Sequence, residues 1–592
     1  MQSYLVIRRA LSVLVLSCLA LPAIAQVSTE EFTVIMLPDT QHYSRNYPQI
    51  FNSQTKWIAE NATKLNIKFV VGVGDVVNNG ESDTQFQNAD AAVRTLDNAN
   101  IPYVLPVGNH DYMYSKPSSR DATKFNRYFG PNRYSGYSWY KGNYPSGSNE
   151  NFYAVFNVNG KPYLVLALEF YPRQKALDWA SSILAANADK EVILLTHSYV
   201  NNDNTRVGRC DYANAESMGV GNDNDGDEMW SRFIRKNKNI RMVLSGHIHG
   251  VGRRTERGDN GNIVNQILAD YQGEHMGGNG YLRILRYKPA LNQIEVKTYS
   301  PYANAYRTDS ANQFTVPMYA TAENAGTGKV DGYVRGADCR ELPGANVVTS
   351  SGQATADASG KYVVAAPAPA TQSVAAGKSG WVSKTLSLAV STNLSTLGDF
   401  YLEPALPCTL SSTDKSVTVC TPTSTATSPV KVAAGGRSLA GMSSMTLYVD
   451  GKKLYSTSGD KLIGSFAMSS GTRSLTVKGW DKAGNSFSKS RTITVTSGSS
   501  YCTLSSSSVT VCTPKESATY KGLVRVTAAG PTGRTISSMS VYLNGVKVYG
   551  VSANRMDTWL GMGARPQRLT VKATDSSGNS YSKTVSFSMA LP

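Results

Sequence analysis

The chain has 592 residues, which is too many for a single hydrophobic core, so we expect three to five domains. Its net charge is +16, but residues 406–500 and 501–592 contribute +7 each and residues 26–405 are close to neutral. The charge therefore gives no reason to expect a nucleic-acid-binding surface on the N-terminal part of the chain.

The first 25 residues have the pattern of a cleaved secretory signal. Two arginines precede an apolar stretch that ends in the small-residue triplet Ala23-Ile24-Ala25. A lipid anchor on Cys18 is the alternative, although "VLSC" fits a lipobox poorly. No later run approaches the roughly 18 apolar residues of a membrane helix. We therefore expect a secreted, periplasmic or cell-surface protein without a membrane span.

The N-terminal half alternates between strand-like and helix-like patterns. The expected strands are residues 32–37, 67–74, 103–108, 161–170, 191–197 and 240–247, and the expected helices are residues 52–65, 84–99, 173–188 and 227–238. This alternation predicts a layered α/β domain. Three further strands, at 263–271, 281–287 and 294–299, are expected to be antiparallel and to close a second sheet.

Helix-like patterns stop near Gly328, and short strands and turns follow. Residues 326–405 resemble the carboxypeptidase regulatory-like β-sandwich through "LPGA" at 342–345 and "ATADASGKY" at 354–362. The same pattern of strands and turns fits a β-sandwich of no particular family, which stays open as the alternative.

The rest of the chain contains a repeat with an offset of 94 residues: "MTLYVDGKKLY" at 445–455 matches "MSVYLNGVKVY" at 539–549. Both copies alternate polar and apolar residues and are rich in turns, with expected hairpins at Asp450-Gly451 and Asn544-Gly545. The pattern predicts two immunoglobulin-like β-sandwiches. Their expected bounds are residues 406–498 and 499–592.

Cysteines after the signal fall into pairs. The pairs expected to form disulfides in an exported chain are Cys408–Cys420 and Cys502–Cys512. Cys210 and Cys339 either pair across a domain junction or stay free, and the sequence leaves both possibilities open.

Polar residues of the metal-ligand type follow five of the expected strands, each just past the end of the strand. They are Asp39, Gln41, Asp75, Asn109, His110, Asp111, His197, His247 and His249. Sites in open α/β sheets assemble at the carboxyl ends of the strands, so we expect these side chains to converge. Asp75 could bridge two divalent cations about 4 Å apart, which could hold a hydroxide and neutralise a phosphate.

These motifs resemble the calcineurin-like metallophosphoesterase family, whose pattern is Asp-x-His, Gly-Asp-x-x-Asp/Asn, Gly-Asn-His-Asp/Glu, His and Gly-His-x-His in that order. Here they stand as Asp39-Thr40-Gln41, "GDVVN" at 74–78, "GNHD" at 108–111, His197 and "GHIH" at 246–249. The resemblance covers roughly residues 30–300. It implies a four-layer sandwich of two mixed β-sheets flanked by helices over residues 26–325, before the three all-β sandwich domains.

The resemblance also implies a role for each residue. The first metal would be bound by Asp39, Gln41, Asp75 and His249, and the second by Asp75, Asn109, His197 and His247. Metal-bound hydroxide would attack phosphorus, while His110, oriented by Asp111, would protonate the leaving oxygen. Gln41 stands where the family usually has His, as in a "DTQ" subgroup. An amide oxygen is a harder and weaker ligand, so Mn or Fe is favoured over Zn at that site.

Other residues near these motifs have two interpretations each. His42 is either a substrate contact or a surface histidine at the rim, and His275 either reaches the cleft or does not. Asn78 either shapes the pocket or only ends a turn. The acidic stretch 221–230 resembles a calcium loop, but a helix cap by Asp227 or a neighbour is favoured. The Tyr-rich segment 127–156 forms either a cleft wall or a surface loop.

The function expected from all this is hydrolysis of phosphomonoesters or phosphodiesters by an exported enzyme that uses two divalent ions, Mn, Fe or Zn. The alternative is a cell-surface or polymer-binding protein whose phosphoesterase-like domain is secondary or inactive. In either case the basic repeats could hold the chain on an anionic envelope or polysaccharide.

Overall fold

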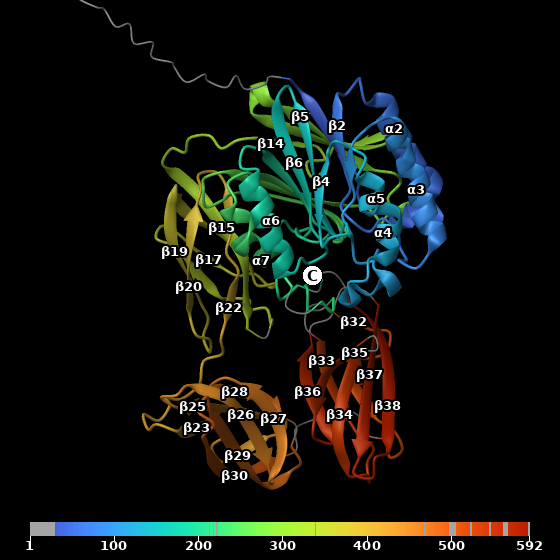
Figure 1. Ribbon diagram of the computed structural model, residues 1–592. Helices are drawn as coiled ribbons and strands as arrows, with labels where there is room; N and C mark the ends of the chain where they lie inside the picture. Colours follow the sequence, from blue (N-terminus) through green and yellow to red (C-terminus); the bar gives the residue numbers. More distant parts are fainter. Residues whose placement is uncertain are drawn as a thin grey trace, which may run out of the picture.

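The computed structural model describes residues 30–589 except 212, 217, 221–222, 338, 467, 497–504, 521–523, 544–545 and 561–565 (Figure 1). The expected signal with Cys18, the cysteine at 502 and the hairpin at 544–545 lie outside the described residues. Within the described part, no helix has the length and apolar character needed to span a membrane.

Two seven-stranded sheets form the N-terminal part (Figure 1). The first has the order β13-β12-β11-β1-β2-β3, with β14 beside β12; its strands are β1 (Phe32–Met36), β2 (Ile67–Val71), β3 (Tyr103–Val104), β11 (Leu282–Lys288), β12 (Gln293–Ser300), β13 (Ala305–Arg307) and β14 (Phe314–Pro317). The second has the order β4-β5-β6-β7-β8-β10-β9; its strands are β4 (Tyr140–Tyr144), β5 (Asn151–Val158), β6 (Lys161–Ala167), β7 (Glu191–Leu195), β8 (Ile240–Ser245), β9 (Gly250–Arg257) and β10 (Ile263–Asp270).

The pairing of β10 differs from the sequence-based expectation. β10 runs parallel to β8 in the second sheet, whereas β11 and β12 are antiparallel and belong to the first sheet beside β1. The three strands therefore do not form one antiparallel unit. Because β10 is parallel to β8, its carboxyl end lies at the same edge as the end of β8.

Helices pack on the outer faces of the two sheets. They are α1 (Gln41–Asn46), α2 (Pro48–Asn61), α3 (Asp83–Asn98), α4 (Thr123–Phe129), α5 (Pro131–Tyr134), α6 (Gln174–Ala186) and α7 (Gly226–Arg232), with short 3-10 turns η1 (Met113–Ser115), η2 (Pro117–Ser119), η3 (Ile234–Lys236), η4 (His275–Gly277) and η5 (Pro289–Leu291). In α3, Ser82 caps the first turn, and Phe86, Ala89, Val93 and Leu96 are buried at helical spacing.

A separate apolar core lies between the two sheets. The rings of Phe32 and Tyr287, from the first sheet, stack with their centroids 4.5 Å apart, and Phe32 also meets Tyr163 of the second sheet at 5.1 Å. All three side chains are less than a tenth exposed. This burial fixes the two sheets face to face and therefore fixes the edge at which their strands end.

The Tyr-rich segment 127–156 is neither a cleft wall nor a solvated loop over most of its length. It contains α5, β4 and most of β5, and β4 pairs with β5 at the edge of the second sheet. Tyr134 and Phe152 are fully buried, with ring centroids 5.7 Å apart. Its aromatic side chains contribute to the hydrophobic core.

Only strands and turns follow β14 along the described chain. The next strands are β15 (Gly326–Gly336), β16 (Asn346–Val348), β17 (Gln353–Thr355), β18 (Lys361–Ala368), β19 (Ala370–Gly377), β20 (Lys384–Val390), β21 (Ser395–Leu397) and β22 (Phe400–Leu402). They form two four-stranded sheets, which enclose a core containing Val330, Val364, Val374 and Phe400.

The sequence repeat is matched by a repeat in strand order. The strands of the first copy are β23 (Ser416–Thr421), β24 (Thr425–Thr427), β25 (Val430–Arg437), β26 (Met442–Val449), β27 (Lys452–Ser458), β28 (Lys461–Phe466), β29 (Gly471–Asp481) and β30 (Ser486–Thr496). Those of the second are β31 (Thr510–Thr513), β32 (Thr519–Tyr520), β33 (Val524–Ala529), β34 (Ile536–Leu543), β35 (Val546–Val551), β36 (Arg555–Leu560), β37 (Pro566–Asp575) and β38 (Ser580–Met589).

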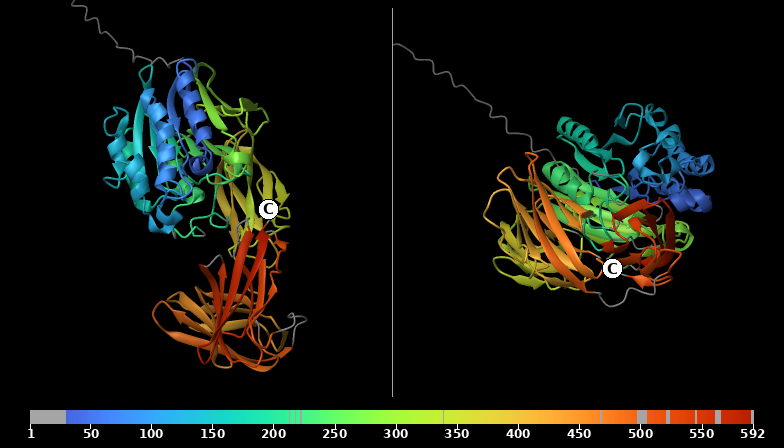
Figure 2. Two further views of the ribbon diagram at one scale, coloured as in Figure 1. Left: turned by 90° about the vertical axis from the view of Figure 1, so that its right-hand side faces the viewer. Right: turned by 90° about the horizontal axis from the view of Figure 1, so that it is seen from below.

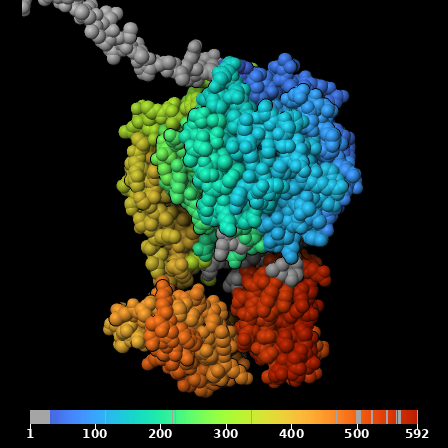
Figure 3. Space-filling view, in the orientation of Figure 1, coloured from blue at the N-terminus to red at the C-terminus, as the bar shows by residue number. Residues whose placement is uncertain are grey.

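Each copy pairs a three-stranded sheet with a five-stranded one, in the orders β23-β25-β28 with β24-β30-β29-β26-β27 and β31-β33-β36 with β32-β38-β37-β34-β35. The two copies lie side by side below the rest of the chain (Figures 2 and 3). Val551 and Ala553 of the second copy pack against the core of the first.

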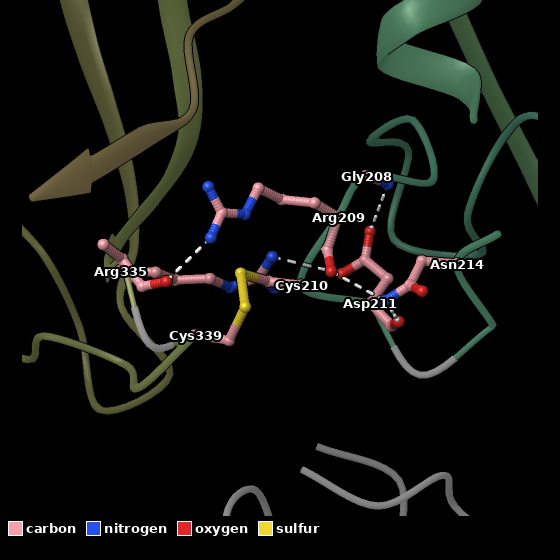
Figure 4. The surroundings of a disulfide bond; sticks show 8 residues. Gly208, Arg209, Cys210, Asp211, Asn214, Arg335 and Cys339 are labelled. Atoms are coloured by element: carbon pink, nitrogen blue, oxygen red, sulfur yellow. Dashed lines mark hydrogen bonds and ion pairs between the residues drawn. A yellow bond between two sulfur atoms is a disulfide. The ribbon is translucent and has the colours of Figure 1, made fainter. Parts of the chain in front are cut away.

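A disulfide joins the loop after β7 to the strands that follow β14. Cys210 and Cys339 are bonded, with their Cα atoms 5.2 Å apart, which settles the alternative that the sequence left open (Figure 4). Beside it, Arg335 pairs with Asp211 at 3.2 Å. The expected bond between Cys408 and Cys420 is also present, and Cys512 is disulfide-bonded.

Buried charges extend the same junction. Arg254 on β9 pairs with Asp331 on β15 at 2.6 Å and with Glu256 at 3.0 Å. Glu256 also pairs with Arg206 and accepts a hydrogen bond from the backbone N–H of Leu397 at 3.0 Å. The side chains of Arg206, Arg254 and Glu256 are each only 4% exposed, so covalent and ionic links hold the β15–β22 unit on the α/β part.

Candidate metal centre

Five strand ends meet at one edge of the two sheets. β1, β2 and β3 lead into the segments that carry Asp39, Asp75 and Asn109, while β7 and β8 lead into those that carry His197 and His247. Hydrogen bonds join these segments across more than 200 residues of sequence: the N–H of His247 donates to Oδ2 of Asp39 at 3.1 Å. The predicted convergence of these side chains is thus seen in the structure.

Asp75 lies at the middle of the cluster. Its Oδ1 accepts from the N–H of His110 at 2.8 Å, and its Oδ2 lies 2.9 Å from Nε2 of Gln41 and 3.2 Å from Nε2 of His197. The residue has φ 48°, a left-handed conformation that ends the strand direction abruptly. Burial raises the pKa of Asp75, but His197 and His110 outweigh it and hold the pKa below its usual value.

His197 presents one defined ring nitrogen to the cluster. Its Nδ1 lies 2.8 Å from the carbonyl oxygen of Val73, so Nδ1 carries the proton and Nε2 faces Asp75 and Oδ1 of Asn109, the latter at 3.0 Å. The imidazole of His247 stands 5.0 Å away, centroid to centroid. Ligand atoms of Asp75, His197 and His247 all lie within 4.8 Å of one another, a spacing that fits one cation.

Asp39 supplies the second indication of a cation. Its Oδ1 is buried and has no hydrogen-bond partner among the described residues, while Oδ2 accepts from His247 and from Nε2 of Gln272 at 3.2 Å. Burial, followed by the charges of Asp270 and Asp75, raises the pKa of Asp39 well above its ordinary value. A buried, unpartnered carboxylate oxygen is costly unless a cation compensates it, so the donor set fits a metal.

Two glycines of the motifs are required by close approach. A Cβ at Gly246 would lie 2.0 Å from Oδ1 of Asp39, and a Cβ at Gly108 would lie 2.3 Å from Oδ1 of Asp75. Any side chain at either position would therefore displace a ligand carboxylate.

His110 and Asp111 are arranged differently from the expectation that Asp111 orients the imidazole. Nδ1 of His110 lies 2.9 Å from the carbonyl oxygen of Asn78, which fixes the ring. Both oxygens of Asp111 accept from backbone, from the N–H of Val77 at 2.9 Å and of Gly108 at 2.8 Å. Burial and the charge of Asp75 raise the pKa of Asp111 to about 7. Asp111 thus holds two loops together, and Asn78 shapes the site through its backbone.

Of the remaining histidines, His249 and His42 are more exposed than His197. His249 is exposed, its ring lies against Gly273, and its carbonyl accepts from Asn202 at 3.0 Å. His42, in the first turn of α1, is half-buried against Gly277. His249 as a ligand of the first metal stays a prediction.

The acidic stretch 221–230 serves as a helix start where the structure describes it. Asp225 caps α7 and forms a capping box with Glu228, and Asp227 pairs with Arg206 at 3.0 Å. The preference for a cap over a calcium loop is therefore confirmed, with the neighbour Asp225 as the capping residue.

Sequence reasoning missed two buried residues of the cluster, Asp270 and Gln272. Asp270 ends β10, so the rule that located the other ligands, polar residues just past a strand end, would have found it had β10 been recognised as parallel to β8. Gln272 contacts Asp39 and Gln41.

Comparison with known proteins agrees with this geometry. Residues 13–251 match the family model described as calcineurin-like phosphoesterase. This stretch of the chain, less than half of its length, is thus similar to calcineurin-like phosphoesterases. The phosphoesterase resemblance found in the sequence is confirmed at that level, and the family suggests metal-dependent hydrolysis of phosphoesters.

Similar proteins match only parts of the chain. The chain is 35% identical over 290 residues to the uncharacterized protein YvnB of Bacillus subtilis (strain 168), a match that covers 47% of this chain and 21% of that protein. The chain thus covers about a fifth of that relative's length.

Two solved structures are similar to parts of the chain. The purple acid phosphatase PPD1 from yellow lupin (Lupinus luteus) seeds is 13% identical, with a TM-score of 0.32, over 49% of this chain and 54% of that one. The protein TT1561 of Thermus thermophilus is 12% identical, with a TM-score of 0.25, over 48% of this chain and 100% of that one.

Proposed function

We propose that this protein is an exported phosphoesterase that hydrolyses phosphomonoesters or phosphodiesters with two divalent cations. The observation that supports it most directly is the cluster of the buried residues Asp39, Asp75 and His197 with the partly exposed His247, in which one carboxylate oxygen has no partner within the described chain. Neutral imidazole nitrogens and carboxylate oxygens are the ligand atoms that bind Mn, Fe or Zn in proteins.

Two sets of side chains would hold the cations. They are Asp39, Gln41, Asp75 and His249 for the first, and Asp75, Asn109, His197 and His247 for the second. When bound, the cations would neutralise charge on the phosphoryl group and make a water molecule acidic enough to act as the nucleophile. Phe170 packs against the imidazoles of His197 and His247, with centroids 5.6 and 5.2 Å away, and excludes water from that side.

His110 is the proposed proton donor to the leaving oxygen. It is partly exposed, unlike His197, so a substrate can reach it. The contact of Nδ1 with the carbonyl of Asn78 leaves Nε2 as the atom that faces the substrate and transfers the proton. Asp111 keeps the 74–78 and 108–111 loops at a fixed separation and so keeps His110 in place relative to Asp75.

The finer architecture belongs to the same proposal. We assign residues 26–325 to a four-layer phosphoesterase sandwich, 326–405 to a carboxypeptidase regulatory-like β-sandwich, and 406–498 and 499–592 to two immunoglobulin-like repeats. Residues 1–25 would be a cleaved signal. Disulfides at Cys210–Cys339 and Cys408–Cys420 support an oxidising, extracellular location.

Hydrolysis of a chromogenic monoester and diester, with and without added Mn2+, tests the activity. We expect Asp75→Ala to lose both Mn2+ binding and turnover, because its carboxylate would serve both sites. His110→Ala should bind Mn2+ as the wild type does while turnover falls. Wild-type protein without metal-dependent turnover of either ester would contradict the proposal.

A second function, binding to an anionic polymer or envelope surface, rests on the net charge of +14 carried by residues 406–592. Deleting these residues should leave turnover of small esters unchanged and abolish retention on an anionic polysaccharide at low salt. Full-length protein that is not retained, or that is retained equally in high salt, would exclude electrostatic attachment.

A further inference from the structure

Asp270 and Gln272 form a polar pair inside the cluster to which no role has been given. β10 delivers Asp270 beside the end of β8, and Gln272 follows two residues later. Asp270 is 1% exposed and Gln272 is 7% exposed, so every hydrogen bond they make or lose counts energetically.

The amide of Gln272 can adopt only one orientation. Its N–H and its Nε2 donate to the two oxygens of Asp270 at 2.8 and 2.9 Å, and Nε2 also lies 3.2 Å from Oδ2 of Asp39. Both side-chain hydrogen bonds to these carboxyl groups come from Nε2, so the NH2 group faces Asp270 and Asp39. Oε1 of Gln272 consequently faces the other way, toward Gln41.

The orientation of Gln41 follows from that of Gln272. Nε2 of Gln41 donates to Oε1 of Gln272 and to Oδ2 of Asp75, the latter at 2.9 Å. Since both hydrogen bonds of this side chain within the described residues come from Nε2, Oε1 is the atom left for another partner. Asp270 therefore fixes the orientation of the Gln272 amide, and Gln272 in turn fixes the orientation of the Gln41 amide.

The orientation of the side chain at position 41 matters because this residue is a glutamine and not a histidine. A histidine there would offer a ring nitrogen lone pair to a cation. An amide in the wrong orientation would present an NH2 group, which repels a cation, and the two orientations have nearly the same shape.

We propose that Gln272, anchored by Asp270, is a positioning residue that holds the Gln41 amide with Oε1 toward the first cation. The inference rests on the proposed function, because it presumes that the cluster binds cations. It concerns two residues outside the expected ligand set. It explains how Gln41 could act as a ligand at the position where the family usually has histidine.

Asp270→Asn is the sharpest variant, because it is isosteric and replaces an accepting oxygen by an NH2 group. It also removes one negative charge, and the comparison of Gln41→His with and without Asp270→Asn measures the effect of that charge separately. With Oδ1 still accepting from the N–H of Gln272, the new NH2 group faces Nε2 of Gln272 and turns that amide over. Gln41 then turns as well and presents NH2 to the cation. We expect Mn2+ affinity at the first site to fall about 10- to 100-fold, the usual effect of losing a residue that orients a ligand.

The experiment titrates metal-stripped full-length protein with Mn2+ by calorimetry. We expect wild type to bind two ions, and Asp270→Asn to retain the second site at wild-type affinity. Gln272→Met removes the amide that contacts Gln41 and should weaken Mn2+ binding at the same site. Gln41→His added to Asp270→Asn should restore affinity to within a few-fold of Gln41→His alone, because an imidazole does not depend on amide direction. Gln54→Met is the matched control and should bind like wild type, because Gln54 is a buried amide whose side-chain hydrogen bonds within the described residues go to the carbonyls of Gly280 and Tyr281.

The outcomes separate the two claims. Wild-type protein that binds no Mn2+ would overturn the proposed function. Two ions bound by wild type and bound with unchanged affinity by both Asp270→Asn and Gln272→Met would overturn this inference alone. Weakening that Gln41→His does not rescue would also overturn it, because the pair would then be acting on general stability. Unfolding temperatures of the metal-free variants check that each is folded.

Discussion

Glu256→Gln at the junction gives the most quantitative prediction about stability. Glu256 lies between Arg206 and Arg254, and all three side chains are 4% exposed. Burial raises the pKa of Glu256, but the two guanidinium groups outweigh it and lower the pKa from 4.5 to about 2. A shift of that size corresponds to roughly 3 kcal/mol of stability. Arg206 keeps Asp227 and Arg254 keeps Asp331 as a partner, so we expect the variant to lose about 3 kcal/mol and not more.

Urea unfolding of the full chain, followed by tryptophan fluorescence, measures the loss. Trp230 contributes a signal from the junction, because Arg206 lies over its ring at 4.8 Å. A carboxyl with a depressed pKa stabilises the fold above its unfolded pKa and loses that contribution as pH falls. The difference between wild type and Glu256→Gln should therefore be full at pH 6 and shrink from about pH 4.5 toward pH 2.

Asp259→Asn is the control, because its pair with Arg235 is well exposed and should contribute less than about 1 kcal/mol. A Glu256→Gln protein within about 1 kcal/mol of wild type at pH 6, or a difference that does not change with pH, would refute the reasoning.

Three further predictions concern the junction and the proposed catalytic site. Burial and the charge of Asp227 raise the pKa of Asp399 to about 8. The free energy of unfolding of wild type should therefore fall as pH rises from about 4 to 8, and urea titrations of Asp399→Asn should not show this fall. Equal pH profiles for the two proteins would contradict the prediction. Replacing Cys210 and Cys339 with serine opens a loop of 129 residues and should cost up to about 5 kcal/mol, seen as a lower unfolding temperature, and an unchanged temperature would count against it. His110→Asn should lower kcat about 10²- to 10⁴-fold for alkyl esters and much less for nitrophenyl esters, which need little protonation on leaving; equal losses would argue against proton donation.

The polar cluster could be anticipated from sequence because each of its predicted residues follows an apolar strand in a short motif. Asp39, Asp75, His197 and His247 are brought together by parallel strands whose carboxyl ends share an edge, and this rule needs no knowledge of distant contacts. The α/β character of the first part was equally accessible from alternating periodicities.

The parts that escaped prediction depend on non-local pairing. β10 is an apolar run that suits either strand direction, and only its place between β8 and β9 makes it parallel to β8 and brings Asp270 to the site. Asp111 follows His110 directly, yet its oxygens bond to the backbone of Val77 and Gly108, a choice that depends on how two loops meet. The partner of Cys210 lies 129 residues away in another unit, where spacing carries no information.

The junction has a practical consequence for expression of the α/β part alone. The family match stops at residue 251, inside β9, and a cut at 325 would remove Asp331, Cys339 and Leu397 while keeping the groups they contact. Such a fragment would display Arg206, Arg254 and Glu256 to solvent and leave an unmatched thiol at Cys210. The shortest piece worth cloning therefore runs beyond β22, to about residue 405, and fragments trimmed to the recognisable homology should aggregate.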